Sequence, residues 1–254
     1  MNLKEQWFSI KKGDEAKKLY RVFCFYYAGG SSTVYKNWVT KECEIEFIPV
    51  ELPGRGKRIC ESCIENFDAL IDELVPNLKN IIDERPFFFY GHSMGAAIAF
   101  KVAHRLHKLY GIYPEKLIVA GRHAPHREDP STFKISMGKA ALVEELKRLE
   151  GTPKEVLENE ELLQFVLPLI ESDYKLHENF KYYGEKVSIP IIAHAGTEDL
   201  EANIDEMKYW NEVTNDFFQI KEFKGNHFFV QDLGEEYVAE IIKIVMNTET
   251  KKVM

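Results

Sequence analysis

Residues 87–100 read FFFYGHSMGAAIAF, and this stretch decides the fold class. Its wholly apolar start is typical of a β-strand that is covered on both faces, and the small and apolar residues at its end predict a helix. Between them lies GHSMG (residues 91–95), which has the pattern Gly-x-Ser-x-Gly. In a sharp strand-to-helix turn, this pattern presents the serine hydroxyl at the carboxyl edge of a sheet, beside the free N–H groups of the helix. Ser93 is therefore the predicted nucleophile, and the alternative is a glycine-rich turn with an incidental serine.

A serine hydroxyl is a poor nucleophile unless a base accepts its proton, so this turn predicts an acid and then a histidine after later strands. After the predicted strand PIIAH come Glu198 and Asp199, and after the predicted strand FFQIKEF comes His227. We expect His227 to be the base, because it alone among the eight histidines lies in a loop after the last predicted strand. Asp199 is the preferred acid, with Glu198 as the alternative and Glu201 as a more distant one.

An oxyanion hole needs two backbone N–H groups that point toward the developing negative charge. Met94 directly follows the predicted nucleophile and supplies one of them. The other is expected from the loop FYYAGGSS after the first predicted strand, because its glycines let the backbone approach a substrate closely. Ala28 is the preferred donor and Gly29 is the alternative. We expect Tyr27, Gly29 and His123 to contact the substrate.

Apolar and amphipathic stretches alternate along most of the chain. Strands are predicted over residues 21–26, 44–51, 86–90, 116–120, 190–194 and 217–223, and helices over residues 67–82, 96–109 and 233–246. This alternation predicts parallel βαβ units, and hence an α/β fold with a mostly parallel, doubly wound sheet. Residues from about 126 to 186 are helix-like and are interpreted as a helical insertion over one end of the sheet, within a single domain spanning residues 1–254.

Composition and charge limit the possible functions. The chain has 254 residues and a net charge of −8, and an acidic surface repels nucleic-acid phosphates and anionic lipids. Because no signal-peptide pattern and no membrane-spanning apolar window is found, a cytoplasmic protein is expected. Cys60 and Cys63 form a C-x-x-C pair, but a four-ligand zinc site would need a second such pair. The four cysteines are therefore interpreted as free thiols, and no metal site is expected.

Several segments together resemble the type II (external, stand-alone) thioesterases of nonribosomal peptide and polyketide synthesis, which belong to the α/β-hydrolase superfamily. The matching segments are FYYAGGSS (25–32) with Trp38, ELPGRG (51–56), FYGHSMG (89–95), GRHAPH (121–126), GTPKEVL (151–157), Leu167-Pro168 and Ser172-Asp173-Tyr174. The sequence differs at Tyr27, where proline is expected in many relatives. General esterases lack this combination, which extends over nearly the whole chain.

The resemblance implies an α/β-hydrolase fold with a helical lid. It implies that Ser93 is the nucleophile, Asp199 the orienting acid and His227 the general base, and that Ala28 and Met94 donate to the oxyanion. The implied reaction is hydrolysis of acyl groups from the phosphopantetheine thiol of acyl or peptidyl carrier proteins, which clears misprimed or stalled synthases. No cofactor is implied, since phosphopantetheine belongs to the substrate, and a monomer is expected. The alternatives are a general carboxylesterase or lipase, an acyltransferase, and a non-catalytic binding protein of the same fold.

Overall fold

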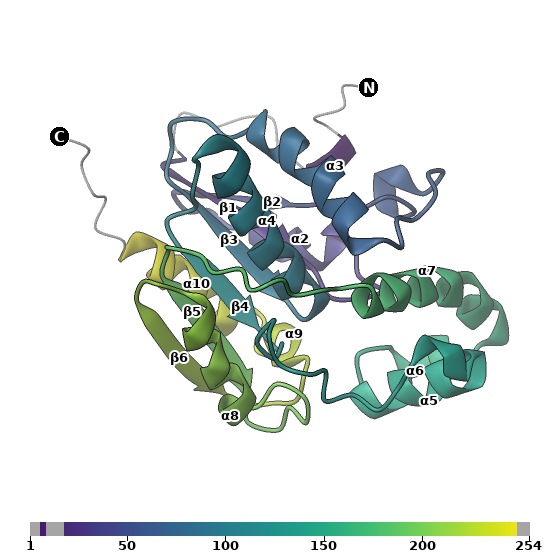
Figure 1. Cartoon of the computed structure of the whole chain (residues 1–254). Coiled ribbons are helices and arrows are strands. Elements are labelled where there is room, and N and C mark those ends of the chain that lie inside the picture. Colours follow the sequence, from purple (N-terminus) through teal and green to yellow (C-terminus); the bar gives the residue numbers. More distant parts are fainter. Residues whose placement is uncertain (1–5, 9–17, 248–254) are drawn as a thin grey trace.

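The computed structural model describes residues 6–8 and 18–247. Its centre is a six-stranded sheet with the strand order β2-β1-β3-β4-β5-β6, in which each strand is parallel to its neighbours (Figure 1). The strands are β1 (Tyr20–Phe25), β2 (Ile45–Pro49), β3 (Phe87–His92), β4 (Leu117–Ala120), β5 (Ile191–Gly196) and β6 (Phe218–Phe223). The chain extends the sheet from β1 to β2, and then crosses back to continue from β3 on the other side of β1. The prediction of a parallel, doubly wound sheet is confirmed, and the predicted strands differ from the observed ones only at their ends.

Helices cover both faces of this sheet. Outside the insertion, the α-helices among residues 18–247 are α2 (Lys36–Val39), α3 (Phe67–Lys79), α4 (Met94–Tyr110), α8 (Ile204–Met207), α9 (Phe229–Asp232) and α10 (Glu235–Met246). Helix α4 packs against β1, β3 and β4, and α3 packs against α4 on the same side. On the opposite face, Tyr90 of β3 contacts Trp38 of α2 and Tyr237 of α10 through their rings. Strand β3 is thus covered on both faces, as its apolar sequence predicts.

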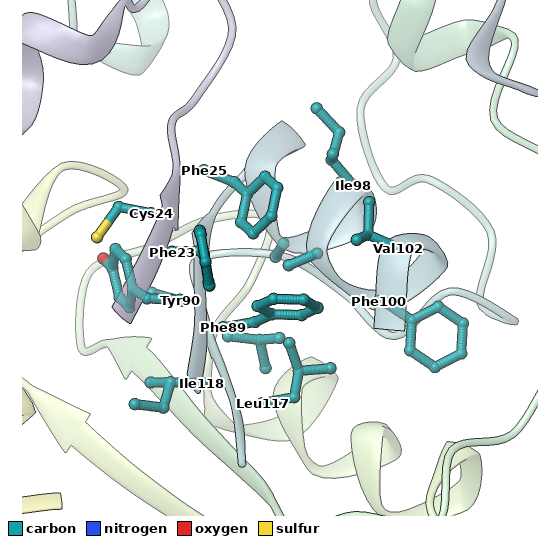
Figure 2. Close-up of a cluster of buried hydrophobic side chains, with 14 of the residues drawn as sticks. Phe23, Cys24, Phe25, Phe89, Tyr90, Ile98, Phe100, Val102, Leu117 and Ile118 are labelled. Atoms are coloured by element: carbon teal, nitrogen blue, oxygen red, sulfur yellow. The ribbon is translucent and has the colours of Figure 1, made fainter. Parts of the chain in front are cut away.

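Aromatic side chains of neighbouring strands form much of the core under α4. Figure 2 shows Phe25 and Phe89 pointing toward the helix that carries Ile98, whereas Tyr90 lies on the opposite side of the strands. The ring centroids of Phe25 and Phe89 are 5.5 Å apart in an edge-to-face arrangement, which is favourable for aromatic pairs. These rings are buried between β1, β3 and α4, so their packing fixes the position of the strand-to-helix turn that follows β3.

The segment between β4 and β5 is helical. It contains the 3₁₀ helix η4 (Ile135–Met137) and the helices α5 (Lys139–Leu149), α6 (Lys154–Leu157) and α7 (Glu160–Glu178), which lie together beyond one end of the sheet in Figure 1. All residues of this segment are described, and no strand occurs among residues 126–186. The segment has its own buried apolar cluster, formed by Phe133, Leu142, Leu146, Leu167 and Ile170. The helix-like sequence of this region therefore corresponds to helices that pack on one another.

The C-terminal end differs from the prediction. A single helix was expected over residues 233–246, but α10 begins at Glu235 and is preceded by the short helix α9. Gly234 separates the two, because its φ of 50° lies in the left-handed region, which interrupts a right-handed helix. Helix α9 begins at Phe229, so the chain enters a helix two residues after His227.

Candidate active site

Ser93 lies in a strained turn between two regular elements. It follows the last residue of β3, His92, and precedes the first residue of α4, Met94. Its φ of 54° and ψ of −120° are unfavourable for a residue with a side chain. The backbone N–H of Ser93 donates to the carbonyl of Ala120 at the end of β4 (2.9 Å), which ties the turn to the neighbouring strand. Such strain is typical of functional sites, and this is the geometry that Gly-x-Ser-x-Gly predicts.

The two flanking glycines let this turn pack closely. A Cβ atom on Gly95 would lie 2.1 Å from the carbonyl oxygen of Phe25 in β1, and one on Gly91 would lie 2.3 Å from the carbonyl oxygen of Gly95. Both neighbours are backbone atoms in buried elements, so they cannot rotate away as a side chain would. The first turn of α4 can approach β1 and β3 only because positions 91 and 95 carry no side chain.

An imidazole and a carboxylate meet at the carboxyl ends of β5 and β6. The Nδ1–H of His227 donates to Oδ2 of Asp199 (2.9 Å), and both residues are buried. The other oxygen of Asp199, Oδ1, accepts the backbone N–H groups of Glu201 (2.9 Å) and Ala202 (3.0 Å). Glu198, the alternative acid, has an exposed side chain. The structure therefore places Asp199, and not Glu198, against His227.

Asp199 and His227 shift each other's pKa in opposite directions. Burial by itself raises the pKa of Asp199, but the hydrogen bond and charge of His227 lower it to about 2. Burial by itself lowers the pKa of His227, but the hydrogen bond and charge of Asp199, together with the charge of Glu201, raise it above the ordinary value. At neutral pH Asp199 is ionised, and His227 is a stronger base than a free imidazole.

The side chain of His92 binds the backbone of His227. Its Nε2 lies 2.8 Å from the carbonyl oxygen of His227, so this nitrogen carries the proton and donates. Burial, together with the nearby charge of His227, lowers the pKa of His92 to about 3. His92 is therefore neutral at physiological pH and holds the backbone of His227 in place.

Two cavities meet at Ser93, and Ala28 and His227 also line both of them. The smaller, of about 60 Å³, has charged and polar residues in its wall, namely Arg122, His123, Asp129, Ser131, Glu145, His177, Glu178 and Glu201. The larger, of about 230 Å³, is lined by apolar residues of the insertion, namely Leu146, Leu149, Pro153, Val156, Val166 and Ile170. Of the residues expected to contact substrate, His123 lines the smaller cavity, and Tyr27 and Gly29 line the larger one.

The two expected oxyanion donors line the smaller cavity beside Ser93. Met94 is the first residue of α4, so its N–H precedes the helical hydrogen-bond ladder and is not used by it. Among residues 6–8 and 18–247, no acceptor is found for the N–H of Ala28. The N–H of Gly29, the alternative donor, is bound to Oδ2 of Asp173 at 2.7 Å. The geometry therefore favours Ala28 over Gly29.

Two polar clusters near the site were not predicted from the sequence. In the smaller cavity, Arg122 donates to Nδ1 of His177 (2.6 Å), and Nε2–H of His177 donates to Asp129 (2.9 Å). Beside the larger cavity, Arg55 forms a buried ion pair with Asp173. Arg55, Arg122 and Asp173 all lie in the quoted family segments, but no spacing rule pairs Arg55 with a residue 118 positions away.

The described residues include no group of three or more histidine, cysteine, aspartate or glutamate side chains arranged to hold a metal ion. Within residues 6–8 and 18–247, no helix is both long and apolar enough to span a membrane.

Comparison with known proteins agrees with this geometry. The model of the thioesterase domain family matches residues 20–245. This chain belongs to the thioesterase family. Among curated relatives of this thioesterase, linear gramicidin dehydrogenase LgrE of Brevibacillus parabrevis is 37% identical over 238 residues, which cover 92% of this chain and 89% of LgrE. Thioesterase PikA5 of Streptomyces venezuelae is 33% identical over 223 residues, 87% of this chain and 79% of PikA5. The solved structure of the type II thioesterase BorB, from the borrelidin biosynthetic cluster, superposes with a TM-score of 0.83 at 31% identity and covers 94% of this chain and 97% of BorB.

Proposed function

We propose that this thioesterase hydrolyses acyl thioesters on the phosphopantetheine arm of acyl or peptidyl carrier proteins, and so clears misprimed or stalled nonribosomal peptide or polyketide synthases. The family match over residues 20–245 and the similarity to PikA5 and BorB support this activity. The single observation that carries the proposal is that Ser93, on its strained turn, lines the same two cavities as His227, whose Nδ1–H is bound to buried Asp199.

In the proposed reaction, His227 accepts the proton of Ser93 while Oγ of Ser93 attacks the thioester carbonyl carbon. The N–H groups of Ala28 and Met94 bind the oxyanion of the tetrahedral intermediate. Its collapse expels the pantetheine thiolate, which takes the proton from His227. Water, deprotonated by His227, then attacks the acyl-serine and releases the acid and Ser93. Asp199 keeps the proton on Nδ1 and stabilises the imidazolium form.

In this proposal, the helical insertion acts as a lid over the nucleophile. Its apolar residues, such as Leu146 and Ile170, line the larger cavity at Ser93, so its position controls access to the nucleophile. The proposed chemistry uses only protein groups and water, and it needs no metal or organic cofactor. The single-domain organisation, the cytoplasmic location and the monomeric state expected from the sequence stay predictions.

The name of LgrE raises a second candidate, because a dehydrogenase transfers hydride and needs a bound nicotinamide. The turn after β1 in this chain reads YYAGGSS rather than the G-x-G-x-x-G of dinucleotide-binding folds. The sequence after β3 likewise has the Gly-x-Ser-x-Gly of a serine nucleophile. Hydrolysis is therefore the function that the site supports best.

The test is a mass-spectrometric assay on carrier proteins loaded with acetyl, propionyl or aminoacyl groups, with matched oxygen esters of the same acyl groups for comparison. We expect release of the free acid and the free pantetheine thiol, faster from the carrier protein than from the oxygen ester, and no release by Ser93→Ala. Persistent turnover by Ser93→Ala would overturn the mechanism. Equal or faster hydrolysis of the oxygen esters would favour a general esterase, and NADPH-dependent reduction of the acyl group would favour a dehydrogenase.

A further inference from the structure

A buried ion pair joins the insertion to the loop after β2. Arg55 and Asp173 are 3% and 1% exposed, and they form two parallel hydrogen bonds, from Nη1 to Oδ2 (2.6 Å) and from Nη2 to Oδ1 (2.7 Å). Arg55 follows Pro53 and Gly54 in the loop after β2, whereas Asp173 lies on α7. The paired, planar geometry is the strongest form of arginine–carboxylate contact.

The same two side chains hold the loop that contains Ala28. Asp173 accepts the N–H of Gly29 through Oδ2 (2.7 Å), and Arg55 donates through Nη1 to the carbonyl of Gly30 (3.2 Å). The N–H of Gly30 closes a turn onto the carbonyl of Tyr27 (3.0 Å). Hydrogen bonds therefore hold the backbone on both sides of Ala28. The N–H of Ala28 itself is left to donate to a ligand in the cavity.

A second contact from α7 reaches the same loop. A Cβ atom on Gly29 would lie 2.9 Å from Cγ1 of Ile170, so the backbone of Gly29 packs directly on this side chain. Ile170 and Asp173 are three positions apart on α7 and so project from one face of the helix. The loop of Ala28 thus has one apolar and one ionic contact with α7, and its position depends on how α7 is seated.

Stability alone does not account for this ion pair. Desolvation offsets most of the attraction between two buried charges, and well-packed apolar residues often replace such a pair without loss of stability. What apolar residues do not provide is an acceptor for the N–H of Gly29. A bidentate pair that also binds the backbone next to an oxyanion donor is suited to fix the orientation of that donor's N–H group.

We propose that Arg55 and Asp173 are positioning residues for the oxyanion hole: they hold the N–H of Ala28 toward the substrate carbonyl only when α7 is seated on the loop. This inference rests on the proposed function and extends it, because it makes the insertion part of the catalytic apparatus as well as a cover. When α7 moves away, Asp173 leaves with it, and the N–H of Gly29 loses its acceptor. The site is then incomplete even though Ser93, Asp199 and His227 are unchanged.

The test separates positioning from stability with matched variants in the full chain. Asp173→Asn keeps the shape but weakens the pairing, and the double variant Arg55→Met/Asp173→Leu removes both charges together. The control is the buried pair of Arg21 and Glu46, 3.0 Å apart on β1 and β2, at the opposite ends of the strands from Ser93. Glu46→Gln and Arg21→Met/Glu46→Leu are the corresponding changes there. Melting temperature, kcat and KM are measured on an acetyl-loaded carrier protein, together with the inhibition constant of a boronic acid, which forms a tetrahedral adduct with a reactive serine.

We expect Asp173→Asn to lower kcat by about tenfold and the double variant by about 100-fold, since loss of one oxyanion donor costs about 10²–10³ in kcat. KM should change little, and boronic acid binding should weaken in proportion to kcat/KM, because both depend on the oxyanion hole. The control variants should keep wild-type kcat whatever their melting temperatures.

Two outcomes would overturn the inference while leaving the proposed function intact. One is wild-type kcat in both the Asp173→Asn variant and the double variant. The other is a kcat that returns to the wild-type value in the double variant as its melting temperature returns, which is the behaviour of a purely structural pair. By contrast, a wild-type enzyme that does not hydrolyse the loaded carrier, or a Ser93→Ala variant that does, contradicts the proposed function itself.

Discussion

Gly95→Ala tests whether close packing of the turn, and not only its serine, is required for catalysis. The added Cβ would lie 2.1 Å from the carbonyl oxygen of Phe25 and 2.7 Å from that of Tyr26, although real Cβ atoms essentially never come within 3.0 Å of another heavy atom. The start of α4 must therefore move away from β1 by about 1 Å. The end of β1 cannot yield, since Phe25 and the following residue, Tyr26, are each only 2% exposed.

The expected effects on stability and on rate differ in size. Overpacking of this kind costs about 1–3 kcal/mol, and the better helix propensity of alanine returns up to about 1 kcal/mol. A net loss of about 1–2 kcal/mol lowers the melting temperature of a chain of this length by about 2–8 °C. Ser93 and Met94 immediately precede position 95, and a displacement of about 1 Å at reacting groups costs about 100-fold in rate. We expect a folded protein whose kcat is about 100-fold lower.

The assay combines thermal unfolding with steady-state hydrolysis of an acetyl-loaded carrier protein. Gly111→Ala is the matched control, because Gly111 ends the same helix, has a φ of 68°, and has no heavy atom within 4 Å of the added Cβ. It should cost about 1 kcal/mol through backbone strain and leave kcat unchanged. Wild-type kcat in Gly95→Ala, or an equal loss of kcat in Gly111→Ala, would refute the packing argument.

Four further results are expected. Ser93→Ala should abolish labelling by a fluorophosphonate and should keep the fold, so labelling that survives would exclude Ser93 as the nucleophile. Ser93→Gly should be equally inactive yet about 1 kcal/mol more stable than Ser93→Ala, because glycine relieves the strain at a φ of 54°; equal melting temperatures would contradict this. For the wild type, kcat/KM should increase with pH through an apparent pKa above 6.5, since the proposed base is neutral His227, whose pKa is raised. Asp199→Asn should shift this increase to lower pH and lower kcat by about 10⁴-fold, and an increase at an unchanged pH would show that Asp199 does not set the basicity of His227.

The parts of the site that follow from local pattern or chain order were predictable. The turn at Ser93 is encoded within fourteen consecutive residues, and parallel strands bring the loops of Asp199 and His227 to one edge of the sheet. The choice between Asp199 and Glu198 was not fixed in this way, because both follow β5 and both are carboxylates. Burial decides between them: Asp199 faces inward and accepts two backbone N–H groups, whereas Glu198 faces solvent.

Long-range contacts explain what the sequence did not reveal. Ala28 was already preferred to Gly29 from the sequence, but the structural reason is Asp173, which is 144 positions from Gly29 and reaches it only because α7 packs over the loop. No periodicity or propensity encodes such a pairing. The break at Gly234 had a visible signal, since glycine commonly interrupts helices, but the apolar pattern of residues 233–246 continues across it. Burial and tertiary packing, rather than local propensity, therefore set the unpredicted part of the site.

A third glycine, outside Gly-x-Ser-x-Gly, lies next to the two imidazoles of the site. Because β4 and β5 lie between β3 and β6, the imidazole of His227 must extend over the end of β4 to approach Ser93. Gly121 directly follows β4, and a Cβ there would lie 3.0 Å from Nε2 of His92 and 3.5 Å from Cε1 of His227. The φ of Gly121, 57°, also lies in the left-handed region, where a residue with a side chain is strained. A side chain at position 121 would therefore press on the imidazole of His92, which supports the backbone of His227, but would make only an ordinary van der Waals contact with His227 itself. The requirement for glycine at position 121 comes from this packing and from its φ, and not from the chemistry of Ser93.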